Sequence, residues 1–180
     1  IMISVVHADD GQFVRLQLPR DEKYVVLVKG APNYILNKCK SGLFQDRMFG
    51  TFDEAAKKRV LRAVDDLSAQ ALRVLAVAIR PLRELPYDPA DALVEAQQKY
   101  ELLNDDLTFV GLIASIDPER EGVREAINVA RGAGVRTVMI TGDYLKTAIA
   151  IAKNIDLINF DNDPEEVSID CTTLRPLGNQ

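Results

Sequence analysis

The sequence contains few of the residues that build metal centres or disulfide frameworks. It has two cysteines, Cys39 and Cys171, and a single histidine, His7. The two cysteines lie far apart in the chain and form no metal-binding pattern, and nothing about them requires an oxidising compartment. No second ligand accompanies His7. We therefore expect neither a metal site nor a catalytic role for this histidine.

Long apolar runs and an excess of basic charge are also absent. No apolar stretch approaches the roughly 18 residues of a membrane-spanning helix, and the opening IMISVVHADDG lacks the basic and apolar regions of a signal peptide. The net charge of −5 argues against nucleic acid as a partner, because such binding depends on clustered cations. Since the chain starts at Ile1, we expect it to be cut from a longer polypeptide.

The composition is that of a folded protein, with 47% hydrophobic and 27% charged residues among 180. Several apolar or alternating runs predict strands, the first two forming a hairpin: 2–7, 13–18, 24–30, 72–82 and 107–116. Three segments predict helices: 31–39, 51–70 and 87–103. Thr51 or Asp53 is the expected cap of the second helix, and 42–50 is expected to be irregular. Together these patterns predict a mostly antiparallel sheet with attached helices.

After Asp117 the pattern changes. Residues 118–134 predict an amphipathic helix that ends at glycines, 135–140 predict a strand, and 143–155 predict a second helix. Helix, strand and helix in quick succession are typical of a parallel sheet. We therefore divide the chain into residues 1–116 and 117–180, with the boundary near the sequence IDPER.

One short motif, Thr141-Gly142-Asp143, follows the predicted strand directly. It has two interpretations. Asp143 could accept hydrogen bonds from the first-turn amides of the next helix, with Gly142 making the turn. Alternatively, the three residues could form a phosphate site at the carboxyl end of a parallel strand.

Four other residues have similar alternatives. Lys29 lies beside Gly30 at a strand end. It is either a solvated lysine next to a turn, or a residue whose cation and aliphatic stem contact a base or phosphate. In the second case Gly30 would let the backbone approach that ligand closely. Arg73 is either a charged residue at the rim of the sheet or an arginine whose guanidinium binds phosphate oxygens through two N–H groups. Asp117 is expected to cap the following helix. Arg120 is either a surface charge in the first turn of that helix or, because a cation there is slightly unfavourable, a residue with a partner.

Four stretches occur in one order: KGAP, LRVLAVAIR, LTFVGLIASIDPER and VRTVMITGDYLKTAIAIAKNI. In this order the chain closely resembles the cytoplasmic region of P-type ion-transporting ATPases, over about residues 1–158. KGAP and MITGD are the most specific of the matching motifs. The calcium-pump branch looks most similar, because SVV, VKGAP and LTFVGLIASIDPER follow its pattern.

The resemblance implies two domains. Residues 1–116 would be the later part of an α+β nucleotide-binding domain, with a mostly antiparallel twisted sheet flanked by helices. Residues 117–180 would be part of an α/β phosphorylation domain of the haloacid-dehalogenase, Rossmann-type fold. By the same resemblance, Lys29 and Gly30 match the adenine-pocket motif, and Arg73 matches an arginine that contacts the phosphates of ATP.

The resemblance also implies roles for the residues around the boundary. Asp117 and Arg120 match the hinge motif between the two domains. Thr141, Gly142 and Asp143 match the motif that holds the transferred phosphoryl group and the nearby ribose. On this interpretation Thr141 offers a hydroxyl, Gly142 lets the chain pass close, and Asp143 both caps the helix and faces the nucleotide.

The chain departs from the family pattern in ways that matter for activity. The Asp-Lys-Thr-Gly-Thr string with the phosphorylated aspartate is absent, and so are the Gly-Asp-Gly-x-Asn-Asp stretch that holds Mg²⁺, the membrane helices and the actuator motif. Without the nucleophilic carboxylate no aspartyl phosphate can form. Smaller departures are DPER for Asp-Pro-Pro-Arg and Asn33 where glutamate is usual.

We therefore expect a soluble, inactive, ATP-binding fragment of a P-type pump. The parent would be an integral membrane protein with this region on its cytoplasmic side, and it would use ATP and Mg²⁺ to transport a cation. The resemblance to the calcium-pump branch implies that this cation is calcium. Its partners would be the remaining parts of the same polypeptide, namely the actuator domain, the rest of the phosphorylation domain and the membrane helices. Two rival hypotheses are a non-catalytic nucleotide-binding regulatory module and a stand-alone haloacid-dehalogenase-like phosphatase.

Overall fold

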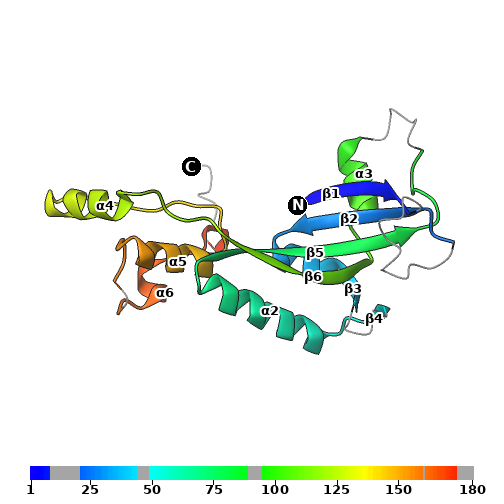
Figure 1. Ribbon diagram of the computed structural model, residues 1–180, viewed down its shortest axis with the longest axis horizontal. Helices are drawn as coiled ribbons and strands as arrows, with labels where there is room; N and C mark the ends of the chain where they lie inside the picture. Colours follow the sequence, from blue (N-terminus) through cyan, green and yellow to red (C-terminus); the bar gives the residue numbers. More distant parts are fainter. Residues whose placement is uncertain (9–20, 44–48, 89–94, 160, 174–180) are drawn as a thin grey trace, which may run out of the picture. The chain divides into compact units, whose positions relative to one another are not determined.

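The computed structural model describes residues 1–8, 21–43, 49–88, 95–159 and 161–173 (Figure 1). The strands of the described residues are β1 (Met2–His7), β2 (Tyr24–Gly30), β3 (Cys39–Leu43), β4 (Phe49–Thr51), β5 (Leu72–Leu82) and β6 (Leu107–Ile116). The helices are α1 (Pro32–Ile35), η2 (Leu36–Lys38), α2 (Glu54–Ser68), α3 (Ala96–Leu103), α4 (Val123–Gly132), α5 (Leu145–Asn154), α6 (Pro164–Val167) and η3 (Cys171–Thr173).

The chain divides into two compact units. Unit 1 comprises Ile1–Val64 and Val74–Ile113, and unit 2 comprises Asp65–Arg73 and Ala114–Gln180. The division along β6 thus falls close to residue 116, and a short segment from the end of α2 to the start of β5 joins the second unit. The assignment of the two parts to a nucleotide-binding and a phosphorylation domain stays a prediction.

The sheet has the strand order β1-β2-β5-β6-β3-β4. β2 lies between β1 and β5 and pairs with both in antiparallel orientation, and β3 pairs with β4 in the same way (Figure 1). β3, however, runs parallel to β6. The sheet is therefore mixed, and the parallel pair was not predicted because β3 has the sequence CKSGL, which carries no strand-like alternation.

Several predicted elements are confirmed. β6 has the predicted bounds and α1 begins at Pro32. β5 covers the predicted run, but its pairing continues past Pro81, which we expected to end the strand, to Leu82. α2 is capped by Asp53, whose Oδ1 accepts a hydrogen bond from the Ala56 amide at 2.7 Å. The second strand of the predicted hairpin, 13–18, lies outside the described residues.

Two predictions in unit 1 need correction. The helix expected at 87–103 begins only at Ala96; residues 87 and 88 are not helical, and 89–94 lie outside the described residues. The segment 42–50, expected to be irregular, contains the end of β3 and the start of β4. The helix thus starts later than local composition suggested, and a short strand pairing replaces part of the expected irregular segment.

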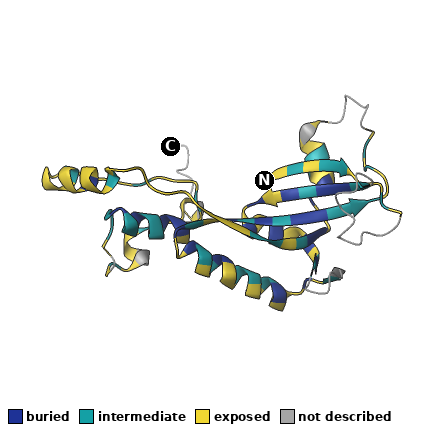
Figure 2. Cartoon of the chain, viewed as in Figure 1, coloured by how far each residue is buried: buried dark blue, intermediate teal, exposed yellow. Residues whose placement is uncertain are grey.

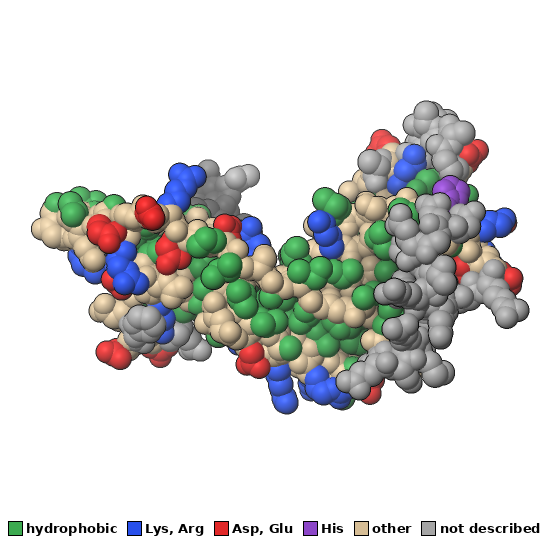
Figure 3. All heavy atoms as spheres, in the orientation of Figure 1, with side chains coloured by type: hydrophobic (Ala, Val, Ile, Leu, Met, Phe, Trp, Pro, Cys, Tyr) green, Lys and Arg blue, Asp and Glu red, His purple; other side chains and the backbone are tan. Residues whose placement is uncertain are grey.

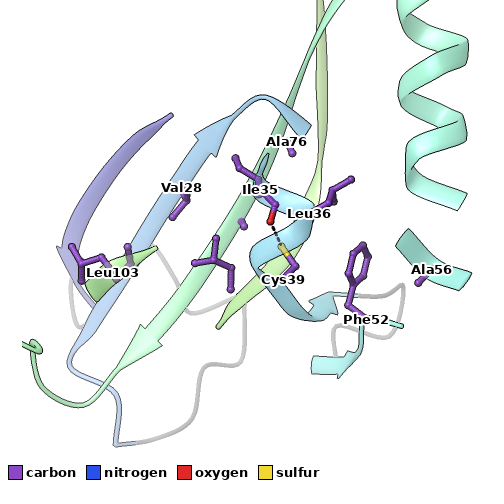
Figure 4. Packing of buried hydrophobic residues seen from close by; sticks show 11 residues of the cluster. Val28, Ile35, Leu36, Cys39, Phe52, Ala56, Ala76 and Leu103 are labelled. Carbon is purple, nitrogen blue, oxygen red and sulfur yellow. Dashed lines mark hydrogen bonds between the residues drawn. The ribbon is translucent and has the colours of Figure 1, made fainter. Parts of the chain in front are cut away.

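The core of unit 1 lies between the sheet and its helices. Val26 and Val28 of β2 and Ala76 and Ala78 of β5 alternate toward it, and Leu107 enters it from β6. The remaining buried members come from α1, η2, α2, α3 and their flanks: Ile35, Leu36, Cys39, Phe52, Ala56 and Leu103 (Figure 4). Figure 2 shows the same concentration of buried residues along β2 and β5.

In unit 2, polar contacts join α4 to the end of α5, and the buried apolar residues of this unit include Ile127, Ala148, Ala152 and Ile155. The Arg124 guanidinium donates to the Asn154 carbonyl and lies 3.3 Å from Asp156 Oδ2, measured from Nε. Arg131 donates to the carbonyls of Asp156 and Leu157. The Asn154 carbonyl is one that the end of α5 leaves without a helical partner, whereas Asp156 and Leu157 follow the helix.

The strand predicted at 135–140 is not formed. The side chains of Val138 and Ile140 are 68% and 90% exposed, and no strand pairs with this segment within the residues that the structure describes. An isolated run cannot satisfy its backbone groups as a sheet does. The parallel sheet expected for the second part of the chain is therefore absent from the described residues.

Candidate functional site

Arg73 stands at the centre of a polar cluster in unit 2. Its Nε and Nη2 both donate to Oδ1 of Asp143, at 3.0 and 2.7 Å. Its Nη1 lies 3.8 Å from Oδ2 of Asp117. Three candidates separated by long stretches of sequence therefore meet at one place. The Arg73 side chain remains half exposed, so an anion from solvent can reach it.

Thr141 and Asp143 are tied to each other within their loop. The Thr141 hydroxyl accepts a hydrogen bond from the Asp143 amide and donates one to Asp143 Oδ2, both at 3.1 Å. The carboxylate of Asp143 thus has one oxygen on Arg73 and the other on Thr141. Both polar side chains of the motif are engaged, so a ligand that binds through either of them must compete with one of these bonds.

The helix-capping interpretation of Asp143 is wrong. α5 begins at Leu145, and its N-cap residue is Tyr144, which makes no side-chain capping bond. The Asp143 carboxylate is instead drawn to Arg73, since a charge-assisted bond to a guanidinium is stronger than a bond to a neutral amide. The carboxylate therefore serves the cluster rather than the helix.

Gly142 adjoins open space. A Cβ built on it would meet no heavy atom within 4 Å. Its φ is also outside the left-handed region, which in the described residues only Gly122 and Gly134 adopt among glycines. Within the described residues, neither packing nor backbone conformation demands glycine at this position.

The boundary motif is only partly brought to this cluster. The capping interpretation of Asp117 is wrong, because α4 begins at Val123 with Gly122, at φ 81°, as its N-cap residue. Asp117 faces Arg73 instead. The side chain of Arg120 is exposed and forms no ion pair within the described ranges, so the expected partner is not found there.

Lys29 lies in unit 1, on β2. It is exposed and stands opposite Met2 of β1 and Val77 of β5. The next pair of positions on the same face places Leu27 beside Ile79. Lys29 is therefore a cation beside apolar side chains on this face of the sheet, with Ser4 of β1 opposite Leu27.

Gly30 has a structural role in this fold. It is buried, and a Cβ on it would lie 2.9 Å from Cγ1 and 3.0 Å from Cα of Ile1. The close approach that glycine permits here is therefore that of Ile1. The prediction that it also admits a ligand has no support from this geometry.

Sequence reasoning missed Asp65, Tyr144 and Lys146. The Tyr144 hydroxyl donates to Asp65 Oδ1 at 3.0 Å, and Lys146 Nζ lies 2.5 Å from Asp65 Oδ2. Burial of Tyr144, followed by the hydrogen bond to Asp65, raises the pKa of this phenol above its usual value. One signal was visible, because acidic residues at the carboxyl end of a helix such as α2 are unfavourable.

The described residues contain no group of His, Cys, Asp or Glu side chains that could hold a metal ion. None of the helices described is long and apolar enough to span a bilayer. The polar groups that meet in this cluster are the Arg73 guanidinium, the carboxylates of Asp117 and Asp143, and the Thr141 hydroxyl.

Comparison with known proteins identifies the family. Residues 1–122 match the model of the P-type ATPase, cytoplasmic domain N. The chain is 37% identical over 163 residues to the P-type sodium-transporting ATPase4 of Toxoplasma gondii, covering 84% of the chain and 12% of that protein. It is 38% identical over 141 residues to the calcium-transporting ATPase of Bacillus subtilis, covering 77% and 14%.

A third relative is the human sodium/potassium-transporting ATPase subunit alpha-3, 34% identical over 148 residues, which are 82% of the chain and 14% of that protein. The chain thus spans about an eighth of the length of these relatives. The chain belongs to the P-type ATPase family, and its residues 1–122 are the cytoplasmic domain N of that family.

Proposed function

We propose that this chain binds ATP for a cation pump, with Lys29 against the base and Arg73 against the phosphates. The observation that carries the proposal is the meeting of Asp117 and Asp143 at the half-exposed guanidinium of Arg73, with Thr141 bonded to Asp143. A guanidinium forks onto phosphate oxygens as it does onto a carboxylate. Arg73 can therefore exchange Asp143 for a phosphate without leaving its position.

Replacement of Asp143 by a phosphate at Arg73 gives each neighbouring residue a role. When a phosphate takes the Arg73 donors, the freed Asp143 carboxylate turns toward the nucleotide sugar, and the Thr141 hydroxyl becomes available to a phosphate oxygen. Gly142 leaves the approach open. Asp117 keeps its charge near Arg73 and holds the guanidinium in place.

The pump as a whole would hydrolyse ATP through an aspartyl phosphate and couple this to transport of a cation. The chain contains neither the Asp-Lys-Thr-Gly-Thr string nor the Gly-Asp-Gly-x-Asn-Asp stretch, so this reaction belongs to other parts of the protein. Mg²⁺ does not fit the residues described here, because Asp117 and Asp143 both face Arg73. No step is assigned to the metal at these carboxylates.

Residues 117–180 would form part of a haloacid-dehalogenase-like phosphorylation domain. The exposed segment 135–140 supports this, since its apolar side chains need neighbours that other parts of the polypeptide can supply. Val129 on α4 is 73% exposed as well, and Figure 3 shows apolar side chains beside charged ones over this helix. The remaining phosphorylation domain, the actuator domain and the membrane helices are the proposed partners.

Calcium is the proposed ion, on the resemblance of VKGAP and LTFVGLIASIDPER to the calcium-pump branch. The names of the relatives include calcium, sodium and sodium/potassium pumps. The ion ligands would lie in membrane helices, so transport by the whole pump with each cation in turn is the measurement that decides.

Titration with ATP, followed by NMR, tests phosphate binding. We expect amide shifts at Arg73 and at 141–143 with a dissociation constant of about 1 mM, corresponding to about −4 kcal/mol. Arg73→Ala should remove them, whereas Arg62→Ala, on the exposed side of α2, should not. Unchanged titration of the Arg73 variant would contradict the proposal.

A further inference from the structure

Asp65, near the carboxyl end of α2, connects two residues at the start of α5. Its Oδ1 accepts the Tyr144 hydroxyl and its Oδ2 pairs with Lys146. Both partners adjoin the 141–143 loop, because Tyr144 is the N-cap residue of α5 and Lys146 lies in its first turn. The carboxylate is thus placed where the amino end of α5 favours a negative charge.

The position of Asp65 is unfavourable for its own helix. α2 ends with Asp65 and Asp66 close to its carboxyl terminus and has no basic residue in its last turn. Carboxylates there oppose the helix dipole. The ion pair and the hydrogen bond that Asp65 makes with α5 compensate for this, whereas Asp66 is exposed and has no side-chain partner within the described part of the chain.

The segment that follows makes two more contacts with the same region. The Thr147 hydroxyl, whose residue is only 2% exposed, donates to the Leu72 carbonyl at 3.1 Å. Arg73 holds Asp143. Between Asp65 and Leu72, Ala71 adopts φ 60°, a conformation that costs an alanine about 1 kcal/mol and persists only where neighbouring contacts enforce it.

We propose that Asp65 is a positioning residue for the phosphate site. Through Tyr144 and Lys146 it fixes the start of α5, and with it the 141–143 loop, against the segment that carries Arg73. This matters because binding of a phosphate breaks the Arg73–Asp143 bond. Asp65 and the Thr147–Leu72 bond then remain to keep the loop in place. The inference rests on the proposed binding of ATP phosphates at Arg73.

The test compares Asp65→Asn with Asp66→Asn, a neighbouring substitution of identical charge and shape. Three quantities are measured: the pKa of Tyr144 from its ring carbon shifts, amide hydrogen exchange of 141–147, and the dissociation constant for ATP. In Asp65→Asn we expect the Tyr144 pKa to fall, exchange of 141–147 to rise about tenfold, and ATP binding to weaken about three- to tenfold. Asp66→Asn should leave all three unchanged.

Tyr144→Phe is the second variant, since it removes only the hydroxyl and leaves the Lys146 pair. It should give a smaller rise in exchange over the same residues, with β2 unaffected. Unchanged exchange in both variants would overturn the inference, and so would faster exchange with unchanged ATP affinity. If the unsubstituted chain shows no ATP binding, the proposed function fails, and the exchange of 141–147 alone then decides whether Asp65 positions the loop.

Discussion

At the scale of single residues, the arrangement around Arg73 explains why the motif Thr141-Gly142-Asp143 has these side chains. The Asp143 carboxylate neutralises Arg73, and the Thr141 hydroxyl holds this carboxylate through the bonds at 3.1 Å. Gly142 makes no contact that a side chain would disturb. We propose that glycine is needed here because a side chain would block the approach of a phosphate.

Gly142→Ala separates access from folding. Because the Cβ meets nothing within 4 Å, we expect the free energy of unfolding to change by no more than about 0.5 kcal/mol. ATP binding should weaken severalfold, because the methyl group occupies the approach of the phosphate. Thermal unfolding and ATP titration check the two expectations. A variant that binds ATP as well as the parent would contradict the role of the glycine.

The two cysteines provide a comparison between a buried and an exposed thiol. Burial raises the pKa of Cys39 to about 12, with Lys57 opposing the shift weakly, and its Sγ–H donates to the Ile35 carbonyl at 3.3 Å. Cys171 is exposed. Iodoacetamide at pH 8 should therefore modify Cys171 quickly and Cys39 only after unfolding, as peptide mass spectrometry would show. Equal rates for the two would contradict the packing around Cys39.

The same shift sets a pH dependence. The folded state favours the neutral thiol of Cys39, so its contribution to stability is complete below the usual pKa of 9.0 and falls as pH rises toward about 12. The raised pKa of Tyr144 acts in the same direction. Loss of stability should therefore begin above about pH 9.

At the scale of elements, α2 shows how one side chain fixes a helix start. Asp53→Ala removes the acceptor of the Ala56 amide and should reduce the free energy of unfolding by about 1 kcal/mol. Thr51→Val, at the residue that sequence alone allowed as an alternative cap, should cost clearly less. Urea unfolding of both variants measures the difference. An equal loss in the two would contradict the assignment of the cap to Asp53.

The elements also show which structural features can be predicted from sequence. α2 and β6 follow from local periodicity, and Asp53 was foreseen as a cap because caps depend on neighbours in sequence. The segment 135–140 has the apolar run of a strand, yet a strand also requires a partner, which no local pattern supplies. β3 has no apolar run, and its place in the sheet depends on backbone pairing that its sequence pattern does not reveal.

The same limit applies to the site. Arg73, Asp117 and Asp143 could each be suspected from their place beside a strand end. Their mutual contact could not be deduced, because 70 residues separate Arg73 from Asp143. Asp65 lies 79 residues from Tyr144 and was missed for that reason. The capping roles expected for Asp117 and Asp143 failed because a nearby guanidinium competes for their carboxylates.

At the scale of the whole molecule, the chain should bind nucleotide without turning it over. Incubation with radiolabelled ATP and Mg²⁺, followed by acid quench, should leave no stable label on the protein, because the phosphorylated aspartate of the family is not in this sequence. A larger segment that includes the Asp-Lys-Thr-Gly-Thr string is the positive control. Label on this chain that hydroxylamine removes would contradict the expectation.

The most direct test of ATP binding by this domain is the role of Lys29. In an NMR titration of the chain with ATP, amides of β2 around Lys29 should shift, and Lys29→Ala should abolish these shifts without changing the folded spectrum. Lys58→Ala, an exposed lysine of α2, is the matched control and should titrate like the parent. Loss of binding in the Lys29 variant alone is the predicted result. Equal titration of all three proteins, or no shifts at β2 in any of them, would contradict it.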